Sequence, residues 1–263
     1  MAELYRGMDR AALDAAYNNG AAVRNSAQIV TDWQARSESL RARHAATMDL
    51  RYGPAERNRI DLFRAAQPKA SPLLVFIHGG YWQMRAKDNF SFVAAGPLAH
   101  GVSVALVGYT LAPQARLDAI VAEMHASLDY LSKEHPAIVL SGWSAGGHLT
   151  AMAMSHPAVT AGLAISGIYD LEPMRLSYIN DKLRLDEDEV LRNSPMSLPF
   201  TKKPLQIAYG AAELPELCRQ SEDYAKLLGT KAIGIERCNH FSVLEELASP
   251  HGALTALARK LTA

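Results

Sequence analysis

The sequence predicts an α/β fold in which a mostly parallel sheet carries helices on both faces. Two observations lead to this prediction. Continuous apolar runs of strand length recur along the chain, as is typical of strands buried on both faces, and helical patterns separate them. Strands that alternate with helices form such a sheet. The 263 residues fit a single large domain spanning 1–263. The predicted strands of the sheet are 73–77, 102–107, 137–140, 161–166, 205–209 and 232–236.

Other segments complete the predicted fold. Alternating polarity on either side of Gly53-Pro54 indicates a hairpin formed by residues 47–52 and 59–63. An N-terminal helical extension, residues 1–45, contains two amphipathic pieces that break near Asn18. The stretch 172–203 is an insertion between strands, expected to form a small lid with the extension. The other expected helices are 89–100 (with a break or kink near Gly96-Pro97), 115–133, 222–228 and 251–261.

Composition excludes several classes of function. Lys+Arg and Asp+Glu both number 27, so the formal net charge is zero and no nucleic-acid partner is indicated. The two cysteines, Cys218 and Cys238, form no C-x-x-C pair, which favours a reduced compartment. Residues 1–20 lack the apolar region of a signal peptide, and no run reaches transmembrane length. We therefore expect a cytoplasmic protein without a membrane partner, and a homodimer stays open.

The stretch from Gly142 to Gly146 fits the motif G-x-S-x-G, with Ser144 at its centre. An apolar run precedes it and small, helix-competent residues follow. This strand–turn–helix context pushes the serine hydroxyl out above the sheet edge, while the glycines let strand and helix approach closely. Ser144 is the candidate nucleophile. The alternative is a glycine-rich turn with a solvated serine.

A second candidate functional segment directly follows the predicted strand 73–77. It is His78-Gly79-Gly80-Tyr81-Trp82. Adjacent glycines leave backbone N–H groups free to point at a ligand. Together with the N–H of Ala145, those of Gly80 and Tyr81 are expected to form an oxyanion hole. The alternative is a plain glycine turn, which does not account for the histidine and the two aromatic residues around it.

His240 and a carboxylate are the expected partners of the serine. His240 follows the last predicted strand, where the order serine, acid, histidine requires the general base. Of the remaining histidines, His156 and four others are expected at the surface. Glu213 is the first choice for the acid, because it lies in the loop that follows strand 205–209. A carboxylate there fixes the histidine tautomer. Glu216 is the second choice, and Asp170, more naturally a structural cap, is the third.

With these residues, the chain resembles the α/β-hydrolase superfamily, and within it the kynurenine formamidase (arylformamidase)-like esterases, relatives of the hormone-sensitive lipase group. The segment 78–82 is similar to the H-G-G-x-W oxyanion motif of those formamidases, and 142–147 to their nucleophile elbow. The stretches 166–171 and 216–221 are also of that family's type. Two departures are Trp143, where relatives usually carry histidine or aspartate, and glutamate as the acid.

The expected activity is hydrolysis of short-acyl carboxylic esters or aryl formamides through an acyl-enzyme on Ser144, without cofactor or metal. The bulky side chains of Tyr81, Trp82 and Trp143 are expected to narrow the acyl side and to offer a face for an aromatic leaving group. Met174 and Tyr178 of the insertion are expected to line the pocket. The alternatives are a short-chain thioesterase and a non-catalytic ligand-binding protein on the same fold.

Overall fold

Eight strands form one sheet in the computed structural model, which describes residues 3–44, 46–66 and 72–263. The strand order is β1-β2-β4-β3-β5-β6-β7-β8. The first two strands pair antiparallel with each other and β2 pairs antiparallel with β4, whereas all later neighbours are parallel. The strands are β1 (Ala46–Arg51), β2 (Arg59–Phe63), β3 (Leu73–Ile77), β4 (Val104–Val107), β5 (Ile138–Trp143), β6 (Val159–Ile165), β7 (Leu205–Gly210) and β8 (Ile233–Ile235).

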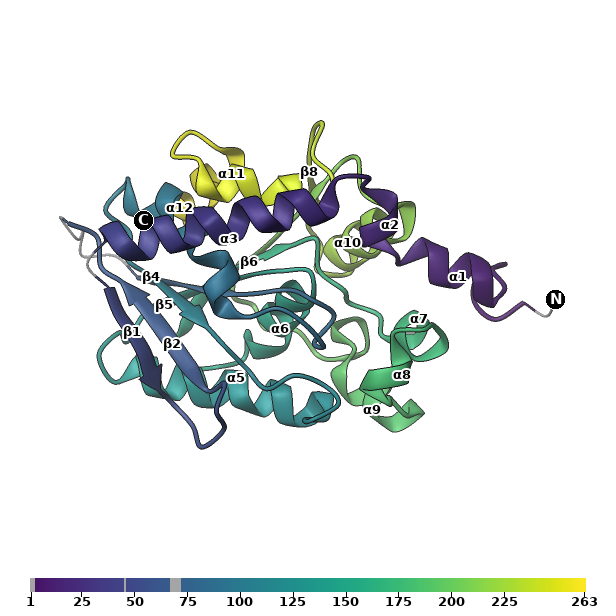
Figure 1. The fold of residues 1–263 in the computed structure, drawn as a ribbon. Coiled ribbons are helices and arrows are strands. Elements are labelled where there is room, and N and C mark those ends of the chain that lie inside the picture. Colours follow the sequence, from purple (N-terminus) through teal and green to yellow (C-terminus); the bar gives the residue numbers. More distant parts are fainter. Residues whose placement is uncertain (1–2, 45, 67–71) are drawn as a thin grey trace.

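The helices cover both faces of this sheet, so the predicted fold class is confirmed (Figure 1). In chain order they are α1 (Arg10–Ala16), α2 (Asn19–Ala22), α3 (Ser26–Arg43), the 3-10 helix η1 (Lys87–Ala94), α4 (Ala95–Leu98), α5 (Leu117–Ser132), α6 (Ala145–Ala153), α7 (Glu172–Leu176), α8 (Asn180–Leu183), α9 (Glu187–Asn193), η2 (Pro195–Ser197), α10 (Pro215–Leu227), η3 (Ser242–Leu244), α11 (Glu245–Ala248) and α12 (Ala253–Leu261).

Two apolar layers sandwich the sheet. Side chains of the central strand β3 alternate between them, with Val75 in one layer and Phe76 in the other. Helices α5 and α6 pack on the first face, and α3, η1, α11 and α12 pack on the second (Figure 1). Burial on both faces explains why β3, β4 and β5 are apolar almost throughout. This packing fixes the ends of the strands. The candidate catalytic residues lie in the loops that follow these ends.

The N-terminal extension differs in detail from its prediction. It contains three helices rather than two pieces, because the side chain of Asn18 caps a further short helix, α2. The long helix α3 crosses the sheet, and its Trp33 is buried against the aromatic side chains of η1. Residues 1–2 and 45 of the predicted extension lie outside the described residues.

Two other predicted helices also differ from those observed. Helix α10 begins at Pro215 rather than at residue 222, since proline suits the first turn of a helix, where its missing N–H is not needed. The predicted helix 89–100 is a 3-10 helix, η1, that continues into α4 at Ala95. Helix α5, at Leu117–Ser132, matches the predicted 115–133 closely.

Candidate active site

Ser144 lies at a sharp turn between β5 and α6. Its backbone has φ 57° and ψ −118°, a conformation that a non-glycine residue adopts only where the surrounding structure holds it. A side chain at Gly142 or Gly146 would not fit. A Cβ atom would lie 2.2 Å from the Gly146 carbonyl oxygen in the first case and 2.0 Å from that of Ile77 in the second. The close approach of strand and helix therefore requires both glycines of the motif.

His240 lies in the loop after β8 with its ring beside the serine. The Nε2 atom is 3.1 Å from Ser144 Oγ. Asn239 shapes this loop, since its Oδ1 accepts hydrogen bonds from the backbone N–H groups of Phe241 and Ser242. Behind the ring, the Trp143 indole donates from Nε1 to the His240 carbonyl oxygen at 2.8 Å. Two local contacts and one from the elbow itself thus orient the histidine.

Among the three candidate acids, the structure brings Glu213 to the histidine. Its Oε2 is 2.8 Å from His240 Nδ1. Glu216 is instead on α10, where it pairs with Arg219. Asp170 accepts the backbone N–H of Glu172, at the start of α7, and the Tyr5 hydroxyl. Both alternatives therefore have structural partners of their own.

The second carboxylate oxygen of Glu213 is also held. Its Oε1 accepts hydrogen bonds from the Ser166 hydroxyl and, at 2.7 Å, from the Gly210 backbone N–H. Ser166, at the end of β6, has φ 51°. The stretch 166–171 resembles the family in sequence, but the sequence predicts no role for Ser166. Its contact to the acid depends on the packing of neighbouring strands β6 and β7, which one sequence does not reveal.

The loop after β3 lies directly against Ser144. A Cβ atom at Gly79 would be 2.9 Å from that of Ser144. Within the described ranges, the backbone N–H groups of Gly79, Gly80 and Tyr81 donate to no acceptor. The N–H of Ala145 belongs to the first residue of α6 and, as at any helix start, has no intrahelical acceptor. Gly79 and Ala145 are buried, and Gly80 and Tyr81 are half-buried, so these backbone donors are suited to binding an oxygen atom of a ligand.

The structure places the four predicted pocket residues in different surroundings. Trp143 is buried in an aromatic cluster, with its ring 5.5 Å from Trp33 and 4.8 Å from His240. Trp82 is also buried and packs edge-on to His148. Met174 is fully buried in the core. Tyr178 is 37% exposed, so of these four it is the side chain that solvent reaches most easily.

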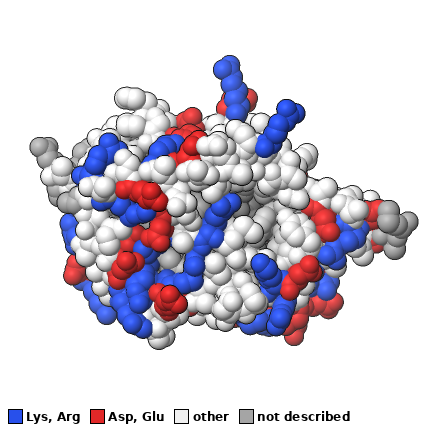
Figure 2. Space-filling model, in the orientation of Figure 1, with Lys and Arg blue, Asp and Glu red and all other residues white. Residues whose placement is uncertain are grey.

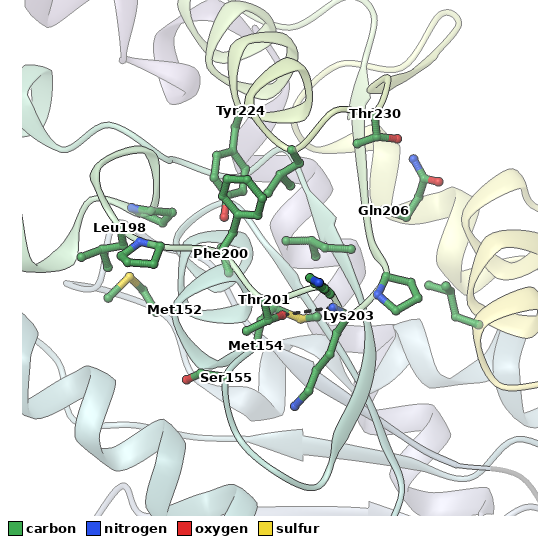
Figure 3. Close-up of a pocket in the computed structure, with 18 residues that line it drawn as sticks. Met152, Met154, Ser155, Leu198, Phe200, Thr201, Lys203, Gln206, Tyr224 and Thr230 are labelled. Atoms are coloured by element: carbon green, nitrogen blue, oxygen red, sulfur yellow. Dashed lines mark hydrogen bonds between the residues drawn. The ribbon is translucent and has the colours of Figure 1, made fainter.

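A sizeable cavity lies away from this site. It measures about 720 Å³ and lies between the C-terminal end of α6, the start of β7 and helix α10 (Figure 3). Met154, Gln206 and Tyr224 are among its lining residues, whereas Ser144, Glu213 and His240 are not. Strand β7 begins near this cavity and ends near Glu213, so the cavity and the contacts among Ser144, His240 and Glu213 lie at opposite ends of the strand.

Two buried histidines near the site are structural. His78 stacks on Tyr109, and the Nε2 of His148 binds the Asn193 carbonyl oxygen at 2.7 Å. Burial lowers the pKa of His78 to about 3 and that of His148 to about 4. The expectation that His156 lies at the surface is wrong. It is buried, with Nε2 3.1 Å from Asp129 Oδ1, because α6 and the following turn fold it inward.

These depressed pKa values predict a loss of stability in acid. The unfolded chain binds a proton at each histidine below pH ~6.5, whereas the folded chain does not until about pH 3 or 4. Neither histidine lowers the stability above pH ~6.5. At pH ~5, each of the two lowers the free energy of unfolding by about 2 kcal/mol. Urea unfolding above pH ~6.5 and at pH ~5 measures this difference in the free energy of unfolding. The stability that His148→Gln loses in acid should be smaller than the loss of the wild type by about 2 kcal/mol. An equal loss in the wild type and the variant contradicts the prediction.

The remaining surface features are unspecific. On the face shown in Figure 2, basic and acidic side chains are interspersed, without an extended area of one sign. Among the residues that the structure describes, no three His, Cys, Asp or Glu side chains are grouped to hold a metal ion. None of the helices in the described part of the chain has the length and hydropathy to cross a lipid bilayer.

Comparison with known proteins identifies the family. The BD-FAE family model matches residues 60–183. Kynurenine formamidase of Danio rerio is 31% identical over 248 residues, which cover 86% of this chain and 85% of that protein. The Salmo salar kynurenine formamidase is 32% identical over 257 residues, covering 88% and 87%. The chain belongs to the kynurenine formamidase family. It is a hydrolase of the carboxylesterase and arylformamidase type, which acts on small ester or amide substrates.

Solved structures support the fold of this family member. A protein from Silicibacter sp. TM1040, provisionally described as a thioesterase, superposes with a TM-score of 0.87 and is 31% identical, covering 93% of this chain and 97% of its own. An esterase from Pyrobaculum calidifontis superposes with a TM-score of 0.68 at 17% identity, covering 92% and 96%. At that identity the second likeness concerns the fold alone, which is the α/β-hydrolase fold.

Proposed function

We propose that the protein cleaves short-acyl carboxylic esters or aryl formamides through a Ser144–His240–Glu213 triad and an acyl-enzyme. The observation that supports this most is the continuous contact from Ser144 Oγ to His240 Nε2 at 3.1 Å and from His240 Nδ1 to Glu213 Oε2 at 2.8 Å. This is the arrangement in which a histidine can accept the serine proton while a carboxylate fixes its tautomer.

The reaction begins when His240 Nε2 takes the hydroxyl proton as Ser144 Oγ attacks the acyl carbonyl carbon. The backbone N–H groups of Gly80, Tyr81 and Ala145 stabilise the resulting oxyanion; one such donor contributes about 3 kcal/mol. His240 then donates its proton to the leaving oxygen or nitrogen. The carbon–heteroatom bond breaks and the acyl group remains on the serine.

Water completes the cycle. His240 removes a proton from a water molecule that attacks the acyl-enzyme, the same donors hold the second oxyanion, and the proton returns to Ser144 as the acid product leaves. Throughout, Glu213 stays ionised and stabilises the imidazolium. Its two further hydrogen bonds, from Ser166 and Gly210, hold the carboxylate in the position that faces His240.

A substrate panel tests the acyl preference. We expect kcat/KM for p-nitrophenyl acetate and N-formylkynurenine to exceed that for p-nitrophenyl octanoate, because Ser144 is only 2% exposed, which leaves little room beside it for a long chain. A marked preference for the octanoate contradicts this. Activity on the acetate without activity on the formamide leaves an esterase. An acetyl thioester in the same panel examines the thioesterase alternative, which the likeness to the Silicibacter protein favours.

We further propose that the insertion 172–203 and the N-terminal extension form a lid within a single domain. Two contacts support it. The Tyr178 backbone N–H donates to Asp14 of α1 at 2.8 Å, and the Gln83 side chain donates to the Ile179 carbonyl oxygen at 2.6 Å. Ser144 is only 2% exposed in this arrangement. We expect these segments to move when a substrate enters.

Tyr178→Ala is expected to change the ratio of kcat/KM values between aryl and alkyl esters several-fold, with little effect on the melting temperature, because its side chain is partly exposed. We do not expect the same of Met174. Its full burial means that Met174→Ala lowers stability by about 2–5 kcal/mol, whatever its effect on the pocket. An unchanged substrate ratio in Tyr178→Ala counts against a lid over the substrate.

A further inference from the structure

The oxyanion loop is held in a conformation that its own sequence does not favour. Gly80, Tyr81 and Trp82 have φ values of 116°, 50° and 58°, so three consecutive residues are in the left-handed half of φ space. For the two aromatic residues this costs on the order of 1 kcal/mol or more each. Such strain persists only where neighbouring groups impose it. In this loop, the hydrogen bonds of the Tyr81 side chain identify such groups.

The phenol of Tyr81 is held by two hydrogen bonds. Its hydroxyl donates to the Tyr17 carbonyl oxygen at 2.6 Å and accepts from Asn19 Nδ2 at 3.1 Å. Asn19 is buried, and burial raises the pKa of the Tyr81 phenol well above its usual value, so the hydroxyl stays protonated and can donate. Tyr17 at the end of α1 and Asn19 at the start of α2, both more than 60 positions away in the sequence, therefore bind the tip of this side chain.

The same N-terminal turn is anchored to the acid side of the site. The Tyr17 hydroxyl accepts from Gln220 Nε2 of α10 at 3.0 Å. Gln220 is fully buried, and its Oε1 accepts the backbone N–H groups of Tyr169 and Asp170 at 2.7 and 2.8 Å. These two residues follow Ser166, which binds Glu213. One chain of hydrogen bonds thus connects the loop after β6, helix α10, the N-terminal turn and the oxyanion loop.

We infer that the turn Tyr17–Asn18–Asn19 is a positioning element of the active site, which fixes Tyr81 through its phenol and thereby aims the N–H groups of the oxyanion loop at the acyl oxygen. The inference rests on the proposed function, because it concerns the donors of the same reaction. Tyr17, Asn19 and Tyr81 act here as positioning residues through their contacts with one another. A donor that is free to rotate away from the oxyanion loses most of its effect on the transition state.

Tyr81→Phe tests this, because it removes the hydroxyl and keeps the ring. With p-nitrophenyl acetate, we expect kcat to fall about tenfold while KM changes by less than about twofold, since the donors act in the transition state. The affinity for phenylboronic acid, whose serine adduct places an oxygen among the same donors, should fall by a similar factor. Rates are divided by the fraction of protein that a fluorophosphonate labels, so misfolded protein does not enter the comparison.

Tyr5→Phe is the matched control. It is the same Tyr-to-Phe change, made in the N-terminal segment, where the Tyr5 hydroxyl binds Asp170 and Arg219 rather than the groups that hold the oxyanion loop. Its kcat and boronate affinity should equal those of the wild type. Unchanged values in Tyr81→Phe, or an equal loss in Tyr5→Phe, overturn the inference alone. A wild-type protein that neither hydrolyses the ester nor takes the phosphonate label overturns the proposed function, and the inference falls with it.

Discussion

Ser144→Ala should lower kcat/KM by at least about 10⁴-fold for every ester or formamide that the wild type cleaves. The hydroxyl is the atom that forms the acyl-enzyme, and no neighbouring side chain can replace it. Its one side-chain partner among the described residues is His240, so the fold should lose no more than about 1 kcal/mol of stability. Steady-state kinetics together with a thermal melt check both parts.

Ser141→Ala provides the matched control on the same strand. The Ser141 hydroxyl is buried and has no hydrogen-bond partner among the described residues. Its removal should leave both activity and stability close to those of the wild type, since a buried unsatisfied hydroxyl contributes nothing favourable. Turnover at the wild-type rate in a folded Ser144→Ala protein contradicts the assignment of the nucleophile.

Glu213→Gln should lower kcat by at least about 10³-fold. The amide can still accept the hydrogen bonds from Ser166 and Gly210, but its NH₂ group then faces His240 Nδ1. That contact favours the tautomer with the proton on Nε2, in which the histidine cannot accept the proton of the serine. Kinetics across the neutral pH range measure the loss, and circular dichroism verifies that the variant is folded.

Glu216→Gln is the comparison that separates the two acids. Glu216 pairs with Arg219, and both side chains are partly exposed, so the change should cost at most about 1 kcal/mol of stability and alter kcat less than about threefold. An inactive Glu216→Gln beside an active Glu213→Gln transfers the role of acid to Glu216. If both variants are active, Asp170→Asn becomes the next protein to measure.

Much of this site follows from local sequence signals. A glycine-flanked serine after a buried strand predicts the elbow, and the order of Ser144, Glu213 and His240, each after its own strand, matches the arrangement that the structure displays. Local signals are sufficient here because the carboxyl ends of parallel strands lie at the same edge of an α/β sheet, which brings the residues that follow them together. Pro215 at the start of α10 is a further signal of this kind, but our prediction began the helix at residue 222 and left Glu216 in a loop.

The supporting contacts could not be predicted in the same way. Gln220 and Tyr17 lie 203 positions apart, and Trp143 contacts Trp33 of a helix that one sequence does not place. Such pairs depend on how the N-terminal extension packs on the sheet. For the same reason the sequence does not distinguish Met174, buried in the core, from the partly exposed Tyr178. Tertiary packing decides between these outcomes.

Covalent labelling of the intact protein tests the central proposal most directly. Wild-type protein is treated with a fluorophosphonate, its residual esterase activity is followed, and the adduct is located by peptide mass spectrometry. The account predicts one adduct per chain, on Ser144, with activity lost in proportion to labelling and no adduct in Ser144→Ala. Full activity without an adduct, or inactivation by an adduct at another residue, would contradict it.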